Sequence, residues 1–145
     1  MMIRRLTLSD FDALARLSHD TFVAAFAAQN NPTDFKIYVE RAFAPATLAA
    51  ELINTNNAFF FIENDTDAEP LGYMKINLRE KPHDILPESR IQNIDFESLT
   101  MMELARIYVR ENYHGKGIAQ KLMEHALELA NTEGVEMLWL GVLGT

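Results

Sequence analysis

The stretch that decides the fold is Glu103-Leu-Ala-Arg-Ile-Tyr-Val-Arg-Glu-Asn-Tyr-His-Gly-Lys-Gly-Ile-Ala-Gln-Lys-Leu-Met-Glu-His-Ala-Leu-Glu-Leu-Ala130. It opens with apolar side chains that predict a strand over Leu104–Val109, and a polar turn with two glycines follows. From Ile118 onward apolar residues recur with helical spacing, which predicts a helix with one face in the core. The apolar stripe consists of Ile118, Leu122, Ala126 and Leu129, and the polar face of Lys121, Glu124, His125 and Glu128.

The turn between this strand and this helix predicts an anion site. Glycines that lead a strand into a helix direct unpaired backbone N–H groups at one point, where the helix dipole adds partial positive charge. The natural anion is a phosphate. Two common phosphate patterns do not fit, because Gln120 stands where the dinucleotide fingerprint needs its third glycine, and G-x-x-x-x-G-K-[S/T] is absent.

Length and composition bound the class of protein. A chain of 145 residues predicts one domain, residues 1–145, with a hydrophobic core large enough to be stable without disulfides or a structural metal ion. There is no cysteine, which excludes disulfides, thiolate metal sites and a cysteine-linked acyl intermediate. The four histidines show no metal spacing. No apolar run is long enough for a membrane span or follows the first residues as a signal segment, so we expect a cytoplasmic protein without membrane contact.

The net charge of −8 argues against nucleic acid as the main ligand. An acidic surface would favour a small cationic substrate. Solubility alone accounts for the charge at least as well, so both interpretations stay open.

The order of patterns predicts an α/β fold with a mixed, mostly antiparallel sheet flanked by helices. Residues 58–62 and 71–78 form an expected hairpin, a capping box is expected at Ser9–Asp12, and Arg79–Glu97 is expected to be a long loop. The last strand–helix–strand unit is a parallel crossover. Strands are expected at 2–7, 58–62, 71–78, 104–109 and 135–142, and helices at 11–28, 35–43, 47–53 and 118–130.

The segment His114-Gly-Lys-Gly-Ile-Ala119 after its strand resembles motif A, Gln/Arg-x-x-Gly-x-Gly/Ala, of the GNAT superfamily of N-acetyltransferases, with His114 replacing the usual Gln or Arg. Further segments are similar to a bacterial spermidine/spermine N-acetyltransferase subgroup. These are Thr21-Phe22, Phe26, Gln29-Asn30, Pro32, Tyr38, Ala42-Phe43, Glu51-Leu52, Phe59–Ile62, Gly72–Asn77 and Leu138–Val142.

The resemblance implies acetyl-CoA as the donor, a primary amine such as a polyamine as the acceptor, and direct transfer without a covalent enzyme intermediate. It implies that the pantetheine arm pairs with the backbone of Ile107, Tyr108 and Val109, where the strand splays from its neighbour. The pyrophosphate would be held by the amides of His114, Gly115, Lys116, Gly117, Ile118, Ala119 and Gln120.

Glu103 stands four residues before Ile107, where the histone-acetyltransferase branch of the family carries its general base. A carboxylate there could take the proton that an alkylammonium must lose before attack. The alternative is a structural glutamate paired with Arg106 or Lys75. Glu111 is expected to be only a solvated loop charge, and Tyr73, Phe59–Phe61 and Trp139 are expected in the core.

The family continues beyond the strand at 135–142 with a helix whose tyrosine usually protonates the departing thiolate, whereas this chain ends at Thr145. We therefore expect a truncated fold, which a single-base insertion in the gene would explain. The exposed strand 135–142 would then seek a partner and give a homodimer or larger assembly. Two alternative functions are a catalytically impaired acetyl-CoA-binding or regulatory module, and acetylation of another amine, such as a protein N-terminus or an antibiotic.

Overall fold

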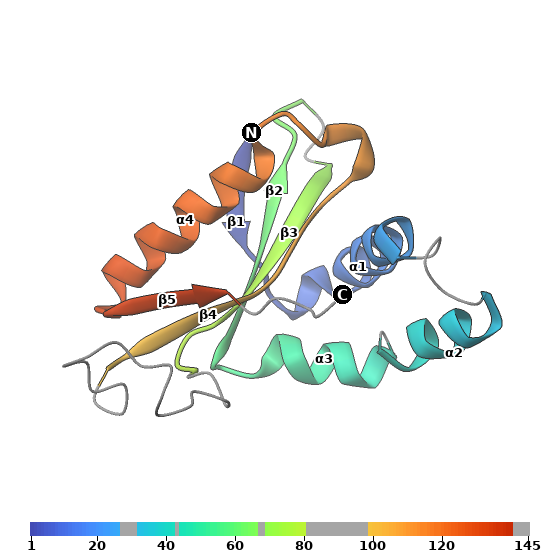
Figure 1. Cartoon of the computed structure of the whole chain (residues 1–145), viewed down its shortest axis with the longest axis horizontal. Helices are drawn as coiled ribbons and strands as arrows, with labels where there is room; N and C mark the ends of the chain where they lie inside the picture. The colour runs from blue at the N-terminus through green and yellow to red at the C-terminus, as the bar shows by residue number, and fades with distance from the viewer. Residues whose placement is uncertain (27–31, 43, 67–68, 81–98, 141–145) are drawn as a thin grey trace, which may run out of the picture.

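The computed structural model describes residues 1–26, 32–42, 44–66, 69–80 and 99–140. Within them a five-stranded sheet is flanked by helices on both faces (Figure 1). The strands are β1 (Met2–Arg5), β2 (Asn57–Glu63), β3 (Pro70–Asn77), β4 (Met101–Val109) and β5 (Met137–Leu140). The helices are α1 (Phe11–Phe26), α2 (Pro32–Ala42), α3 (Pro45–Ile53) and α4 (Ile118–Thr132), with short 3-10 turns η1 (Leu8–Asp10) and η4 (Glu111–Tyr113).

The predicted fold class and crossover are confirmed. The strands lie in the order β1-β2-β3-β4-β5, and every neighbouring pair is antiparallel except β4 and β5. The helix α4 connects these two parallel strands and begins at Ile118, as its sequence pattern predicts. The β2–β3 hairpin is also confirmed.

Two apolar clusters fill the space on either side of the sheet. The α4 cluster includes Phe60, Met74, Leu104 and the stripe residues Ile118, Leu122 and Ala126. The opposite cluster, under α1 and α3, includes Leu14, Leu17, Leu48, Phe59, Phe61 and Tyr73. Because both faces are covered, β2 and β3 are buried almost throughout.

Several local expectations are corrected by the packing. The side chain of His125, expected on the polar face, is half-buried with its ring 4.9 Å from that of Phe60. Trp139 is half-buried on β5 rather than in the core, and its indole N–H donates to the carbonyl of Glu80 at 2.7 Å. Residues 81–97 of the expected loop and 141–142 of the expected last strand lie outside the described residues.

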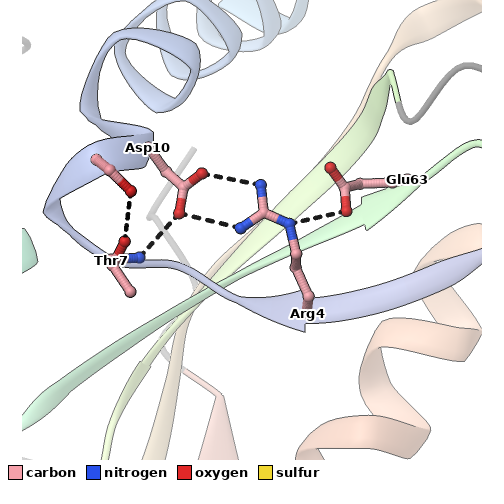
Figure 2. Close-up of polar contacts among 5 residues, drawn as sticks. Arg4, Thr7, Asp10 and Glu63 are labelled. Atoms are coloured by element: carbon pink, nitrogen blue, oxygen red, sulfur yellow. Dashed lines mark hydrogen bonds and ion pairs between the residues drawn. The ribbon is translucent and has the colours of Figure 1, made fainter.

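The expected capping box forms two residues earlier than its sequence pattern indicates. The carboxylate of Asp10 accepts the backbone N–H of Thr7 at 2.9 Å, and it also accepts two N–H groups of Arg4 at 2.8 and 3.0 Å. The same guanidinium donates to Glu63 on β2 at 2.9 Å (Figure 2). Arg4, which interrupts the apolar pattern of β1, therefore links β1, η1 and β2.

Candidate active site

The turn before α4 has the conformation that its glycines allow. Gly115 and Gly117 have φ values of 77° and 75°, in the left-handed region that L side chains rarely adopt. Gly117 is the N-cap of α4, and its carbonyl accepts the N–H of Lys121 at 3.2 Å. By helix geometry the amides of Ile118, Ala119 and Gln120 have no partner within the helix. They are therefore available to an anion.

A pocket of about 350 Å³ opens beside this turn. Ligand pockets of this size class hold small molecules and cofactors. Of the residues predicted for the donor site, five line the pocket: Ile107, Tyr108, Val109, His114 and Ala119. The opposite wall comes from α1, through Thr21, Ala24 and Ala25, which sequence reasoning missed because nothing in the sequence relates α1 to the turn.

The edge of β4 that faces away from β3 is the part of the strand that can pair with a bound molecule. The N–H of Arg110 donates to Leu71 of β3 at 2.8 Å, and successive strand residues direct their N–H and C=O groups to opposite edges. Val109 and Ile107 therefore present these groups away from β3. Among the described residues, which end at Leu140, β5 pairs with β4 over Met101–Leu104 and does not reach Ile107 or Val109.

Tyr108 contributes differently from its two neighbours. Its carbonyl faces β3, only 2.6 Å from where a Cβ on Gly72 would stand, and the residue is also part of the pocket lining. The ring is half-buried 5.7 Å from that of Tyr73, and burial raises the pKa of the Tyr108 phenol, an effect that the charge of Arg106 opposes. Burial also raises the pKa of Tyr73 to about 12. Both phenols are therefore protonated at neutral pH.

A one-residue bulge separates the pocket-lining end of β4 from Glu103. Lys75 faces Arg106 and Ile76 faces Leu104, so Ala105 is the extra residue. Leu104, Ile107 and Val109 pack on the α4 side of the sheet.

The structure corrects both partners that were considered for Glu103. Lys75 and Arg106 donate instead to Glu51 of α3, at 2.6 Å and 2.8 Å. Glu103 accepts from the side-chain amide of Asn77, its register partner on β3, and it does not line the pocket of about 350 Å³. Its proposed role as a base stays a prediction.

Glu111, set aside by sequence reasoning, is the carboxylate that does line this pocket, although it is exposed. The turn itself carries one cation, Lys116, whose ammonium sits 5.2 Å from the centre of the Tyr113 ring. Among the residues that the structure describes, no group of three or more His, Asp and Glu could hold a metal ion.

Comparison with known proteins identifies the class. Residues 13–144 match the model of the acetyltransferase (GNAT) family, and the chain belongs to that family. An uncharacterised N-acetyltransferase of Lactobacillus delbrueckii subsp. lactis is 26% identical over 140 residues, which cover 97% of this chain and 73% of that protein.

Solved structures share the fold at lower sequence identity. The PaiA N-acetyltransferase of Thermoplasma acidophilum, in complex with coenzyme A, has a TM-score of 0.72 and 17% identity over 97% of this chain and 78% of its own. A ribosomal-protein-alanine N-acetyltransferase of Brucella melitensis has a TM-score of 0.63 and 18% identity over 97% and 78%.

The chain is thus an acetyltransferase that uses acetyl-CoA as co-substrate. The turn, the edge of β4 that faces away from β3 and the pocket between them fit this donor, because they supply amides for phosphate and a strand edge for an extended arm. In the described part of the chain, no helix is long and apolar enough to cross a membrane.

Proposed function

We propose that this chain transfers the acetyl group of acetyl-CoA to a primary amine, and that the acceptor is a polyamine such as spermidine or spermine. The observation that supports the reaction is the pocket in which β4 residues meet the start of α4. The two glycines with positive φ leave the amides of the turn open to phosphate, and nothing lies within 4 Å of a Cβ at either position.

In the proposed reaction, the neutral amine nitrogen attacks the thioester carbonyl and forms the new C–N bond. The C–S bond then breaks and the electron pair leaves on the sulfur of coenzyme A. This thiolate takes up the second proton, which the attacking nitrogen loses as it becomes the amide nitrogen. Glu103, directly or through water, takes the proton that the ammonium must lose. A backbone amide on the edge of β4 that faces away from β3, at Ile107 or Val109, polarises the carbonyl as charge develops on its oxygen.

The polyamine proposal rests on charge. The chain carries −8 overall, and Glu111 places a carboxylate on the wall of the pocket. Both would attract a cation with several ammonium groups. The subgroup resemblance of the sequence points to the same acceptor.

Acetylation of another amine is the second candidate, because proteins of this fold act on different acceptors. One solved neighbour is described as a ribosomal-protein-alanine N-acetyltransferase and another as an aminoglycoside acetyltransferase in complex with sisomicin. A third candidate is a chain that holds acetyl-CoA without turning it over. We further propose that the protein acts in the cytoplasm as a homodimer or larger assembly.

Calorimetry with acetyl-CoA, followed by spermidine-dependent release of free coenzyme A, tests the proposal. Binding with turnover would support it. If acetyl-CoA binds and spermidine releases no free coenzyme A, but another amine does, then that other amine is the acceptor. Binding without turnover for any amine would favour the third candidate, and absence of binding would contradict the proposal. Gly117→Ala serves as the control, because a Cβ at φ 75° strains the turn and should weaken binding.

A further inference from the structure

We propose that the side chain of His114 is a positioning residue for the acyl donor. Its ring holds the phosphate turn, residues 114–117, against the last carbonyl of β4, so that the amides of the turn stand ready for the pyrophosphate of acetyl-CoA. This inference rests on the proposed function. It adds a side-chain role to a position for which only the backbone amide is otherwise expected to matter.

The contact joins Nε2 of His114 to the carbonyl oxygen of Val109 at 2.8 Å. A carbonyl oxygen only accepts, so the ring must carry its hydrogen on Nε2. The bond closes a loop of six residues, 109–114, around η4. Two backbone bonds also order that loop, from the N–H of Tyr113 to Arg110 at 2.9 Å and from the N–H of His114 to Glu111 at 3.2 Å.

The carbonyl that accepts this bond lies on the functional edge of the strand. Val109 directs its N–H and C=O groups away from β3, toward the side where the donor arm would pair, and both Val109 and His114 line the pocket. The ring of His114 therefore ties the two halves of the donor site together, since one end of the bond is on the strand and the other on the turn.

The turn needs such a hydrogen bond because its own backbone can adopt many conformations. Gly115 and Gly117 have no side chain to restrict them, and α4 has no side-chain hydrogen bond at its N-cap. Glycines lose the most conformational freedom when they are ordered. If the turn is already ordered before the ligand binds, binding does not have to offset this loss of conformational entropy. The affinity for the ligand is then higher.

Four variants test the role of the ring. His114→Leu removes the N–H donor, His114→Gln keeps a donor at a comparable reach, and His114→Asn keeps an amide that is too short. His19→Leu is the matched control, because His19 is an exposed histidine on α1 that does not line the pocket. Affinity for coenzyme A is measured by calorimetry, and kcat and KM with acetyl-CoA and with S-acetyl-pantetheine, which lacks the pyrophosphate.

For His114→Leu and His114→Asn we expect the affinity for coenzyme A to fall about five- to tenfold, the loss that one hydrogen bond supports. The KM for acetyl-CoA should rise by the same factor, with kcat and the S-acetyl-pantetheine reaction within about twofold of wild type. His114→Gln and His19→Leu should behave like wild type.

Equal affinity in wild type and His114→Leu would overturn the inference, as would equal losses with both donors, which would indicate a general structural defect. If His114→Leu fails to fold, the Gln and Asn variants decide, and equal affinities in those two overturn it. A wild-type chain that does not bind coenzyme A at all would overturn the proposed function and this inference together.

Discussion

At the scale of single residues, the partners of a charged side chain cannot be read from its position in the sequence. Glu103 is the clearest case. Its carboxylate accepts a hydrogen bond from Asn77 and has neither of the cationic partners that the sequence suggested, because both bind Glu51.

Replacing Glu103 by Gln should lower kcat at least about 100-fold while leaving the affinity for acetyl-CoA unchanged, because general-base assistance contributes about 10²–10⁴-fold. Raising the pH should partly restore the rate, since more of the amine is then neutral. Steady-state kinetics between neutral and alkaline pH check this.

Glu128→Gln on the exposed face of α4 is the matched control and should behave like wild type. Unchanged kcat in Glu103→Gln would leave Glu103 as a structural partner of Asn77. The proton would then have to leave by another route.

At the scale of elements, the contact between β3 and β4 sets the shape of the pocket edge. Gly72→Ala would place a Cβ 2.6 Å from the carbonyl oxygen of Tyr108 and 3.2 Å from Cα of Val109. Backbone cannot move aside cheaply, so we expect a loss of about 1–3 kcal/mol in the free energy of unfolding. The affinity for coenzyme A should fall with it, and urea unfolding with calorimetry measures both.

Gly134→Ala is the comparison for this effect. It makes the same chemical change at a φ of 67° with nothing within 4 Å, so it should cost about 1 kcal/mol and leave coenzyme A affinity unchanged. Equal behaviour of the two variants would mean that the close approach of the strands at Gly72 is unimportant.

The link between β1, η1 and β2 predicts a dependence of stability on pH. Hydrogen bonds from Arg4 hold the pKa of Asp10 below its ordinary value of 3.8, although burial opposes them. Asp10→Asn should therefore lower stability by about 1–2 kcal/mol at neutral pH, because the bonds to a charged partner are lost.

Because the pKa of Asp10 is lowered on folding, its contribution is complete above the unfolded-state pKa, near 3.8, and disappears as the pH falls through the folded-state value. The difference between wild type and Asp10→Asn should thus shrink below pH 3.8. Urea unfolding from neutral to acidic pH checks this, and a constant difference would contradict it.

Helices, strands and turns that depend on residues close together in the sequence were predictable from the sequence. Contacts between residues far apart in the sequence were not. The strand, turn and helix from Glu103 to Ala130 follow from local patterns of apolar side chains and glycines. By contrast, Glu51 is separated from Lys75 and Arg106 by 24 and 55 residues. The bulge at Ala105 and the α1 wall of the pocket likewise arise only when the sheet is assembled, because packing rather than propensity decides them.

At the scale of the whole molecule, β5 is the last strand of the sheet in the part of the chain that the structure describes, and it pairs with β4. Its Leu140 is 50% exposed. Exposed apolar edges tend to pair with another chain, so we expect a homodimer through β5 at micromolar concentration, measurable by light scattering.

A charge on this edge should separate the two copies. Leu140→Lys is expected to give a monomer, whereas Leu127→Lys, which makes the same change at an exposed position of α4, should leave the dimer intact. A monodisperse monomer for the wild-type chain would contradict this assembly.

The position of Trp139 has a practical consequence. It is the only tryptophan in the chain, it stands beside Glu103 in the β4–β5 register, and its indole is bonded to Glu80. The tryptophan fluorescence of the protein therefore depends on a single site, the seam where β5 pairs with β4. Fluorescence of the unlabelled protein can follow in real time how that seam responds when a donor molecule arrives at β4.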